Sequence, residues 1–230
     1  MEEKKIIING HEAVDLGLSV KWATCNIGAN NPEELGEKYH WGEIEPPTEK
    51  SRFYDEEKGF VDHTIIGLHY RQGYKRWRHK EDGITRSIII YDISGSDMYD
   101  VARHKWGTKW RMPRVAEVDE LINECTWEPM KIGDQCGCKI TGKNGNSIFL
   151  PTDKGFVGHY LTSLYRIDTS DSEYGCDGAC FLACHGNCGY VIVACGGGAA
   201  LPIRPVTGNE DRIPMFQQYA RKILSKNKGD

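Results

Sequence analysis

The sequence lacks three features that would assign a chain of 230 residues to a broad class at once. No apolar run approaches the roughly 20 residues that a membrane span needs. Basic side chains number 29 against 33 acidic ones, and a net charge of -4 is not typical of a general nucleic-acid binder. The opening string MEEKKIIING contains no signal-peptide core. We therefore expect no membrane span and no nucleic-acid partner, and a location in the cytoplasm, in a phage particle, or at the cell surface after removal of a leader.

Cysteine, by contrast, is abundant and unevenly placed. The chain has 9 cysteines, an odd number, so at least one thiol cannot pair within the chain. Five of them lie between Cys176 and Cys195, and the string CDGACFLACHGNC spaces four of these four residues apart. Because the disulfides of small secreted proteins are usually spread through the chain, this cluster needs a local explanation.

The order of sequence patterns predicts an α+β fold. Residues 11–28 alternate in polarity as one or two short strands do. Two helices are expected next, one over residues 96–107 with Ser96 or Asp97 as its cap, and one that begins at Pro113. The second helix carries an apolar stripe at helical spacing, made of Val115, Val118, Leu121 and Ile122.

The second half of the chain is expected to form antiparallel strands. The Asn144-Gly145 pair lies between two apolar strings, which predicts a hairpin over residues 138–151. Further strands are expected at residues 155–167, 178–185, 188–195 and 199–206, with a turn at His185-Gly186-Asn187.

Two segments do not fit this core. Residues 44–93 form a long insertion in which one strand, RSIIIYDI, is expected. The basic and aromatic string HYRQGYKRWRHK within it could suit nucleic acid, but nothing else in the chain supports a phosphate footprint, so a solvated loop is favoured. Residues 207–230 are expected to form a C-terminal helix and tail that pack on the domain or on a protein partner.

Several strings resemble the Fibrobacter succinogenes major paralogous domain family, which is widespread in gut bacteria of the Bacteroides type. The resemblance covers most of the chain from Glu12 to Val206 and implies a C-type-lectin-like fold over residues 6–206, in which the N- and C-terminal strands meet. Two departures occur, at Leu161-Thr162-Ser163, where the family usually has Trp-Ser-Ser, and at ALPIRPV, where it usually has Gly-Arg-x-Val-Arg-Pro-Val. The strings are EAVDLGLSVKWATCNIGANNPEELGEKYHWGE, YDVARHKWGTKWRMPRVAEVDELINECTW, ITGKNGNSIFLP and LPIRPV.

Proteins of this architecture include sugar-binding lectins, formylglycine-generating enzymes and the variable proteins of diversity-generating retroelements. The calcium-binding strings of the lectins are absent. One acidic loop could hold an ion, but a solvated loop is the simpler interpretation. A catalytic set could be assembled from Ser163, His159, His185 and Asp177, but any chain of this length allows such assembly. The acidic loop consists of Asp168, Asp171, Glu173 and Asp177.

The third use is favoured by a bias in residue types. Retroelement mutagenesis at AAC or AAT codons randomises the first two bases, and the resulting codons cannot encode Lys, Glu, Gln, Trp or Met. None of these five residue types occurs from Tyr174 to Asn209, although all occur elsewhere in the chain. The bias predicts a variable segment at residues 174–200, and an ordinary surface adhesin or glycan-binding protein remains the alternative.

A variable segment of this kind would display outward side chains on a rigid sheet. Alternation along the strands assigns Leu182, Val191 and Val193 to the core. We expect a non-enzymatic protein that needs no cofactor and no metal, and that binds a protein or glycan ligand. The expected contact residues are Tyr174, Cys176, Asp177, Cys180, Phe181, Ala183, His185, Asn187, Cys188, Tyr190, Ile192, Ala194 and Cys195.

The cysteine cluster allows other interpretations. Residues four apart on a strand lie about 13 Å apart, too far to share one zinc ion. Glycines in the segment oppose a helix that would place the thiols on one face. A disulfide of Cys180 or Cys184 with Cys188 or Cys195 is possible in an oxidising compartment. Random placement by mutagenesis is the favoured explanation, with a metal-dependent or cysteine enzyme as the least favoured.

Overall fold

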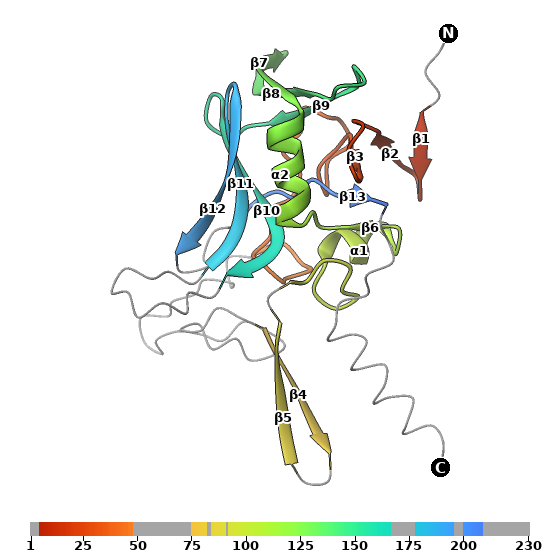
Figure 1. Cartoon of the computed structure of the whole chain (residues 1–230), viewed down its shortest axis with the longest axis vertical. Helices are drawn as coiled ribbons and strands as arrows, with labels where there is room; N and C mark the ends of the chain where they lie inside the picture. The colour runs from red at the N-terminus through yellow and green to blue at the C-terminus, as the bar shows by residue number, and fades with distance from the viewer. Residues whose placement is uncertain are drawn as a thin grey trace.

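The computed structural model describes residues 5–47, 75–81, 84–90, 92–166, 178–195 and 200–208. This part of the chain forms two helices and four antiparallel sheets (Figure 1). The expected α+β class is therefore confirmed. The expected C-terminal helix falls beyond Gly208 and lies outside the described residues.

One sheet joins the two ends of the domain. Val206 pairs with Trp22 on one side and with Arg111 on the other, so the C-terminal strand lies between strands from the first quarter and the middle of the chain. The meeting of N- and C-terminal strands that the resemblance implies is therefore present. In sheet order the strands are β1 (Ile6–Ile8), β2 (His11–Val14), β3 (Lys21–Ala23), β13 (Val206–Thr207) and β6 (Trp110–Arg111).

The guanidinium of Arg204 ties this sheet to the chain around it. Its side chain is buried, and its Nε donates to Asn26 Oδ1 at 2.7 Å. Its terminal nitrogens donate to the carbonyl oxygens of Ala23 at 3.0 Å and Phe149 at 2.9 Å, and to that of Thr24. A buried cation held by so many neutral oxygens fixes the last residues of the domain against β3 and against the segment around Phe149.

Both predicted helices are present, with different starts. The first, α1, spans Val101–Trp106 and is capped by Asp100, whose side chain accepts from the backbone N–H of Arg103. The prediction of Ser96 or Asp97 as the cap was therefore wrong, because residues 96–99 form turns in which Ser96 Oγ accepts backbone N–H groups. The second, α2, spans Val115–Glu124 and therefore begins two residues after Pro113, where its start was expected.

A second sheet contains the predicted hairpin and one strand that the sequence did not reveal. The strands β8 (Gln135–Thr141) and β9 (Ser147–Pro151) pair around the Asn144-Gly145 turn, which confirms the hairpin. The missed strand, β7 (Thr126–Ile132), pairs with β8 along its whole length. Asn146 Nδ2 donates to the carbonyl of Asp15 at 2.9 Å and joins the hairpin turn to the first sheet.

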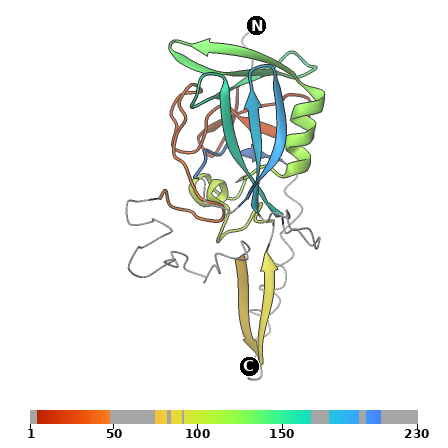
Figure 2. The same ribbon diagram turned by 90° about the vertical axis from the view of Figure 1, so that its left-hand side faces the viewer.

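The third sheet has the order β10-β11-β12 and faces the viewer in Figure 2. Its bounds are Val157–Arg166, Gly178–His185 and Cys188–Cys195, and the last two coincide with the predicted strands. The helix α2 lies across one face of this sheet (Figures 1 and 2). Val118 and Leu121 of α2 share a hydrophobic cluster with side chains from all three sheets described so far.

Within the insertion, β4 (Lys75–Glu81) and β5 (Ile84–Ile90) pair with each other as a separate two-stranded sheet. Both views show this ribbon extending away from the other sheets (Figures 1 and 2). The strand expected at RSIIIYDI is present as most of β5. The prediction of a solvated loop at HYRQGYKRWRHK was wrong for its second half. Residues 75–80 belong to β4 and pair with β5.

Candidate ligand-binding surface

The β11–β12 hairpin is the framework of the predicted variable segment. Its two strands pair without interruption over eight residue pairs, from Gly178 with Cys195 to His185 with Cys188. Gly186 opens the two-residue turn with a φ of 58, a conformation that suits the first central position of a type II′ turn. The backbone N–H of Gly186 donates to the carbonyl of Phe156 at 2.9 Å, which fastens the turn to the start of β10.

The inner face of the hairpin packs on the core. Leu182 is buried in the cluster that contains Val118 and Leu121 of α2, and Val191 packs against the same cluster. The ring of Trp127 fills the space over Gly189, where an added Cβ would lie 2.8 Å from Trp127 Cη2. The predicted core positions Leu182 and Val191 are therefore confirmed, and Gly189 is fixed by packing.

The outer face of β11 is buried as well, which alternation alone did not predict. Phe181 is 8% exposed and its ring meets that of His159 edge-on, with centroids 5.3 Å apart. Ala183 is fully buried on the middle strand of the sheet. Cys180 lies on the inner face with Leu182 and is also buried. These three predicted contact residues therefore do not reach the surface.

The exposed predicted residues gather at the turn. His185, Asn187 and Cys188 are exposed, and Tyr190 is 41% exposed with its ring 5.8 Å from that of His185. Phe156, which sequence analysis did not single out, is 37% exposed beside the turn. We call these five residues, Phe156, His185, Asn187, Cys188 and Tyr190, the turn-end surface. No signal in the sequence singled out Phe156, because it fell inside the strand expected at residues 155–167, whereas β10 begins at Val157.

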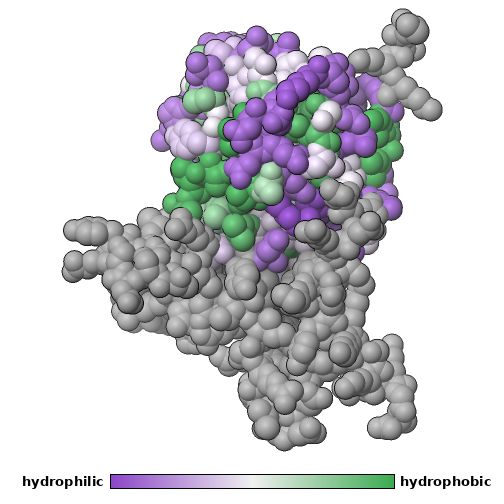
Figure 3. All heavy atoms as spheres, in the orientation of Figure 1, coloured by the Kyte–Doolittle hydropathy of each residue, from purple (hydrophilic) through white to green (hydrophobic). Residues whose placement is uncertain are grey.

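The outer edge of the sheet adds apolar area to this surface. Ile192 and Val193 of the edge strand β12 are half-buried, so neither is fully in the core. Figure 3 shows hydrophobic side chains beside the hydrophilic face of α2, on the side where Figure 1 places β12. Ile192 is therefore only partly accessible, two residues along β12 from Tyr190.

Other predicted positions lie outside the described residues. Tyr174, Cys176 and Asp177 are among them, as is the acidic loop that begins at Asp168. The backbone of Ala194 and Cys195 completes β12, but their side chains are not described.

A catalytic set built on Ser163 and His185 is not formed. Ser163 is fully buried in the irregular part of β10, between Leu161 and Tyr165. His185 of β11 pairs with Val157, and Val157 lies six residues from Ser163 along β10. At about 3.3 Å per residue the two positions are roughly 20 Å apart, which prevents proton transfer between them.

The described thiols do not form a metal centre. Among the described residues, no cluster of three or more His, Cys, Asp or Glu side chains could hold an ion. The register explains this, because Cys188 pairs with His185 on the outer face, whereas Cys180 and Cys184 belong to the inner face. The seven described cysteines are all free thiols, so no disulfide links Cys188 to Cys180 or Cys184.

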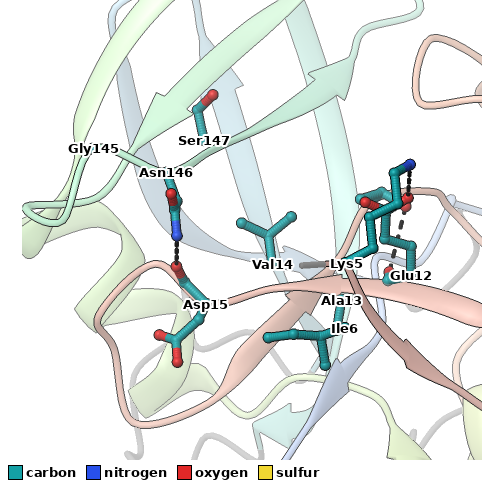
Figure 4. Close-up of a pocket in the computed structure, with 10 residues that line it drawn as sticks. Lys5, Ile6, Glu12, Ala13, Val14, Asp15, Gly145, Asn146 and Ser147 are labelled. Carbon is teal, nitrogen blue, oxygen red and sulfur yellow. Dashed lines mark hydrogen bonds and ion pairs between the residues drawn. The ribbon is translucent and has the colours of Figure 1, made fainter. Parts of the chain in front are cut away.

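A polar cleft of about 470 Å³ lies elsewhere, between β2 and the β8–β9 turn (Figure 4). Its charged groups are already partnered. Lys5 Nζ contacts Glu12 Oε2 at 2.8 Å, and the carboxylate of Asp15 accepts the N–H of Gly17 and pairs with Lys21. Such an open cleft, with its charges satisfied, offers little to a ligand compared with the turn-end surface.

Comparison with known proteins identifies no relative. No protein-family model matches the chain, and no curated protein or solved structure is significantly similar to it. Neither helix in the described part of the chain is long and apolar enough to cross a membrane.

Proposed function

We propose that this chain is a non-enzymatic ligand-binding protein of C-type-lectin-like fold, diversified by a retroelement, with the turn-end surface as the centre of its contact area. The observation that carries the proposal is the placement of the biased segment. The residues of that segment that reach solvent, among those described, gather at one hairpin turn. A variable binding site requires that arrangement, because substitutions there leave the core unchanged.

The framework beneath the surface supports this function. The hairpin is paired along its whole length, backed by α2 on one face, and fastened to β10 through Gly186. A rigid backbone lowers the entropy that is lost when a ligand binds. Side chains that change on such a backbone would alter specificity without altering the fold.

The composition of the turn-end surface indicates the mode of binding. Tyr190, Phe156 and His185 offer aromatic contact area with few rotatable bonds, and Asn187 offers hydrogen bonds. Tyr and Asn are typical of adaptable protein-binding surfaces. The surface carries no acidic, lysine or arginine side chain among its five residues, so shape and hydrogen bonding, rather than ion pairing, would select the ligand.

The DNA around the gene tests the proposal directly. We expect a reverse-transcriptase gene nearby, and a near-copy of the sequence that encodes residues 174–200 which differs from it at adenines of the copy. Absence of both would overturn the retroelement. Near-identical sequence in this segment across isolates, together with binding on a glycan array, would establish an ordinary glycan-binding adhesin instead.

A further inference from the structure

Two cysteines from different sheets meet in the core beneath the turn-end surface. Cys138 lies in β8 and Cys184 lies near the end of β11, and both side chains are fully buried. They belong to the same hydrophobic cluster and are shielded from solvent. The β8 and β11 strands are not neighbours in any sheet, so this contact joins two sheets that backbone pairing leaves separate.

The two thiols interact through a side-chain hydrogen bond. This bond and the nearby backbone N–H of Gly186 lower the pKa of Cys138. The same contact, together with burial, raises the pKa of Cys184, although the guanidinium of Arg204 opposes that shift. The interaction places the two sulfurs next to each other inside the shared hydrophobic cluster.

The other cysteines of the neighbourhood are worse placed to pair. Cys188 lies on the opposite face of the β11–β12 hairpin from Cys184, according to the strand register. Cys180 shares the inner face but stands four residues along the same strand, about 13 Å away. A disulfide requires Cβ atoms about 3.5–4.5 Å apart, so Cys138 is the partner that the fold brings to Cys184.

We propose that Cys138 and Cys184 form a structural disulfide when the chain folds in the presence of an oxidising low-molecular-weight disulfide. One cysteine thiolate attacks the small disulfide, forms a mixed disulfide and releases one small thiol. The second cysteine thiolate then attacks the mixed disulfide at the protein sulfur and releases the other small thiol. The two cysteines lose two electrons and two protons, and the small disulfide is reduced to two thiols.

The bond closes a loop of about 46 residues and fastens the β7–β9 sheet to the middle strand of the hairpin sheet. It constrains the unfolded chain and therefore stabilises the folded domain. Because both sulfurs are buried in the finished fold, exchange takes place during folding, and the completed bond is shielded from reductants. The inference requires only these two thiols and does not depend on the proposed function.

The test is to unfold the purified full chain in urea and refold it with a mixture of oxidised and reduced glutathione. Free thiols are then alkylated under denaturing conditions, and the protein is mapped without reduction. Before alkylation we expect a mass 2 Da lower than that of the reduced chain. After alkylation we expect a peptide pair that links Cys138 to Cys184, and alkylation at Cys188. Thermal unfolding of the oxidised form should occur roughly 5–10 °C above that of the reduced form.

Matched variants separate the bond from other effects of oxidation. Cys184→Val should abolish both the linked peptide and the difference in melting temperature between oxidised and reduced samples, whereas Cys188→Ser should keep both. If Cys184→Val fails to fold, the peptide map of the unmutated chain still decides. Alkylation of both Cys138 and Cys184 in the refolded protein, or a link from either to a different cysteine, would overturn the proposal.

Discussion

At the scale of single residues, a few buried polar side chains hold the scaffold of this domain. Arg204 donates to four oxygens that belong to two separate segments, residues 23–26 and Phe149. Arg111 and Glu117 form a buried ion pair, and Glu117 also accepts the backbone N–H of Arg114. Asp100 accepts backbone N–H groups from Gly95, Arg103 and Met112. Each of these groups satisfies backbone atoms that no strand or helix could pair.

Replacement of Arg204 by lysine tests the first of these groups. A lysine has a single nitrogen in place of the guanidinium fork and cannot reach all four oxygens, so buried carbonyl groups would lose their donors. We expect Arg204→Lys to lower the free energy of unfolding by about 3 kcal/mol in urea denaturation. The control Arg103→Lys, at a partly exposed ion pair with Asp97, should cost less than about 1 kcal/mol. Equal costs for the two variants would contradict the role of Arg204.

The carboxyl group of Asp100 should make stability depend on pH. Burial raises its pKa from 3.8 to about 6, although three backbone N–H groups and Arg111 favour the carboxylate. Since the folded pKa exceeds the unfolded value, the contribution of Asp100 is greatest below about pH 4 and falls as the pH rises through 6.

Asp100→Asn removes this titration and therefore isolates it. We expect the free energy of unfolding of the unmutated protein, relative to the variant, to fall by up to about 3 kcal/mol between pH 4 and pH 7. Urea denaturation at several pH values measures the difference. A difference between the two proteins that stays constant over this range would show that Asp100 does not titrate as described.

At the scale of elements, the β11–β12 hairpin combines a fixed inner face with an exposed turn. Gly189 shows how closely the inner face is packed, because an added Cβ would lie 2.8 Å from Trp127 and 3.2 Å from Leu182 Cδ1. Packing against the core therefore restricts Gly189, although it lies inside the biased segment. Exposed residues at the turn are not restricted in this way.

The variant Gly189→Ala tests this packing. We expect a loss of about 1–3 kcal/mol in the free energy of unfolding, because the new methyl group collides with the ring of Trp127. In a double-mutant cycle, Trp127→Leu should make room, so the two changes together should cost less than the sum of their separate effects. Additive costs would mean that the two side chains do not compete for the same space.

The elements differed in how well the sequence predicted them. The strands β11 and β12 were placed to the residue, because glycines and the His185-Gly186-Asn187 turn bound them closely. The strand β7 was missed, since Pro129 and its run of polar residues hide the alternation that β8 supplies by pairing. Burial of Phe181 and Ala183 was also not predicted, because it depends on tertiary packing such as the contact of Phe181 with the ring of His159 on β10.

At the scale of the whole molecule, the proposed function requires both a rigid scaffold and an exposed surface on it. The N- and C-terminal strands close one sheet, α2 covers the inner face of another, and the turn-end surface projects from the latter. Among the described residues of the biased segment, the exposed ones that the proposed function would use for binding lie at the turn. Cys184 belongs to the biased segment but lies in the core, where it interacts with Cys138 and is not exposed.

The most direct measurement is a profile of natural substitutions, obtained by deep sequencing of this gene from a growing population of its host. The account predicts that amino-acid changes concentrate at His185, Asn187, Cys188 and Tyr190. It also predicts that they are rare at the buried positions Leu182, Cys184 and Gly189, and absent from α2 (Val115–Glu124). Substitution rates that do not differ between the exposed and the buried positions, or a segment without any variation, would contradict it.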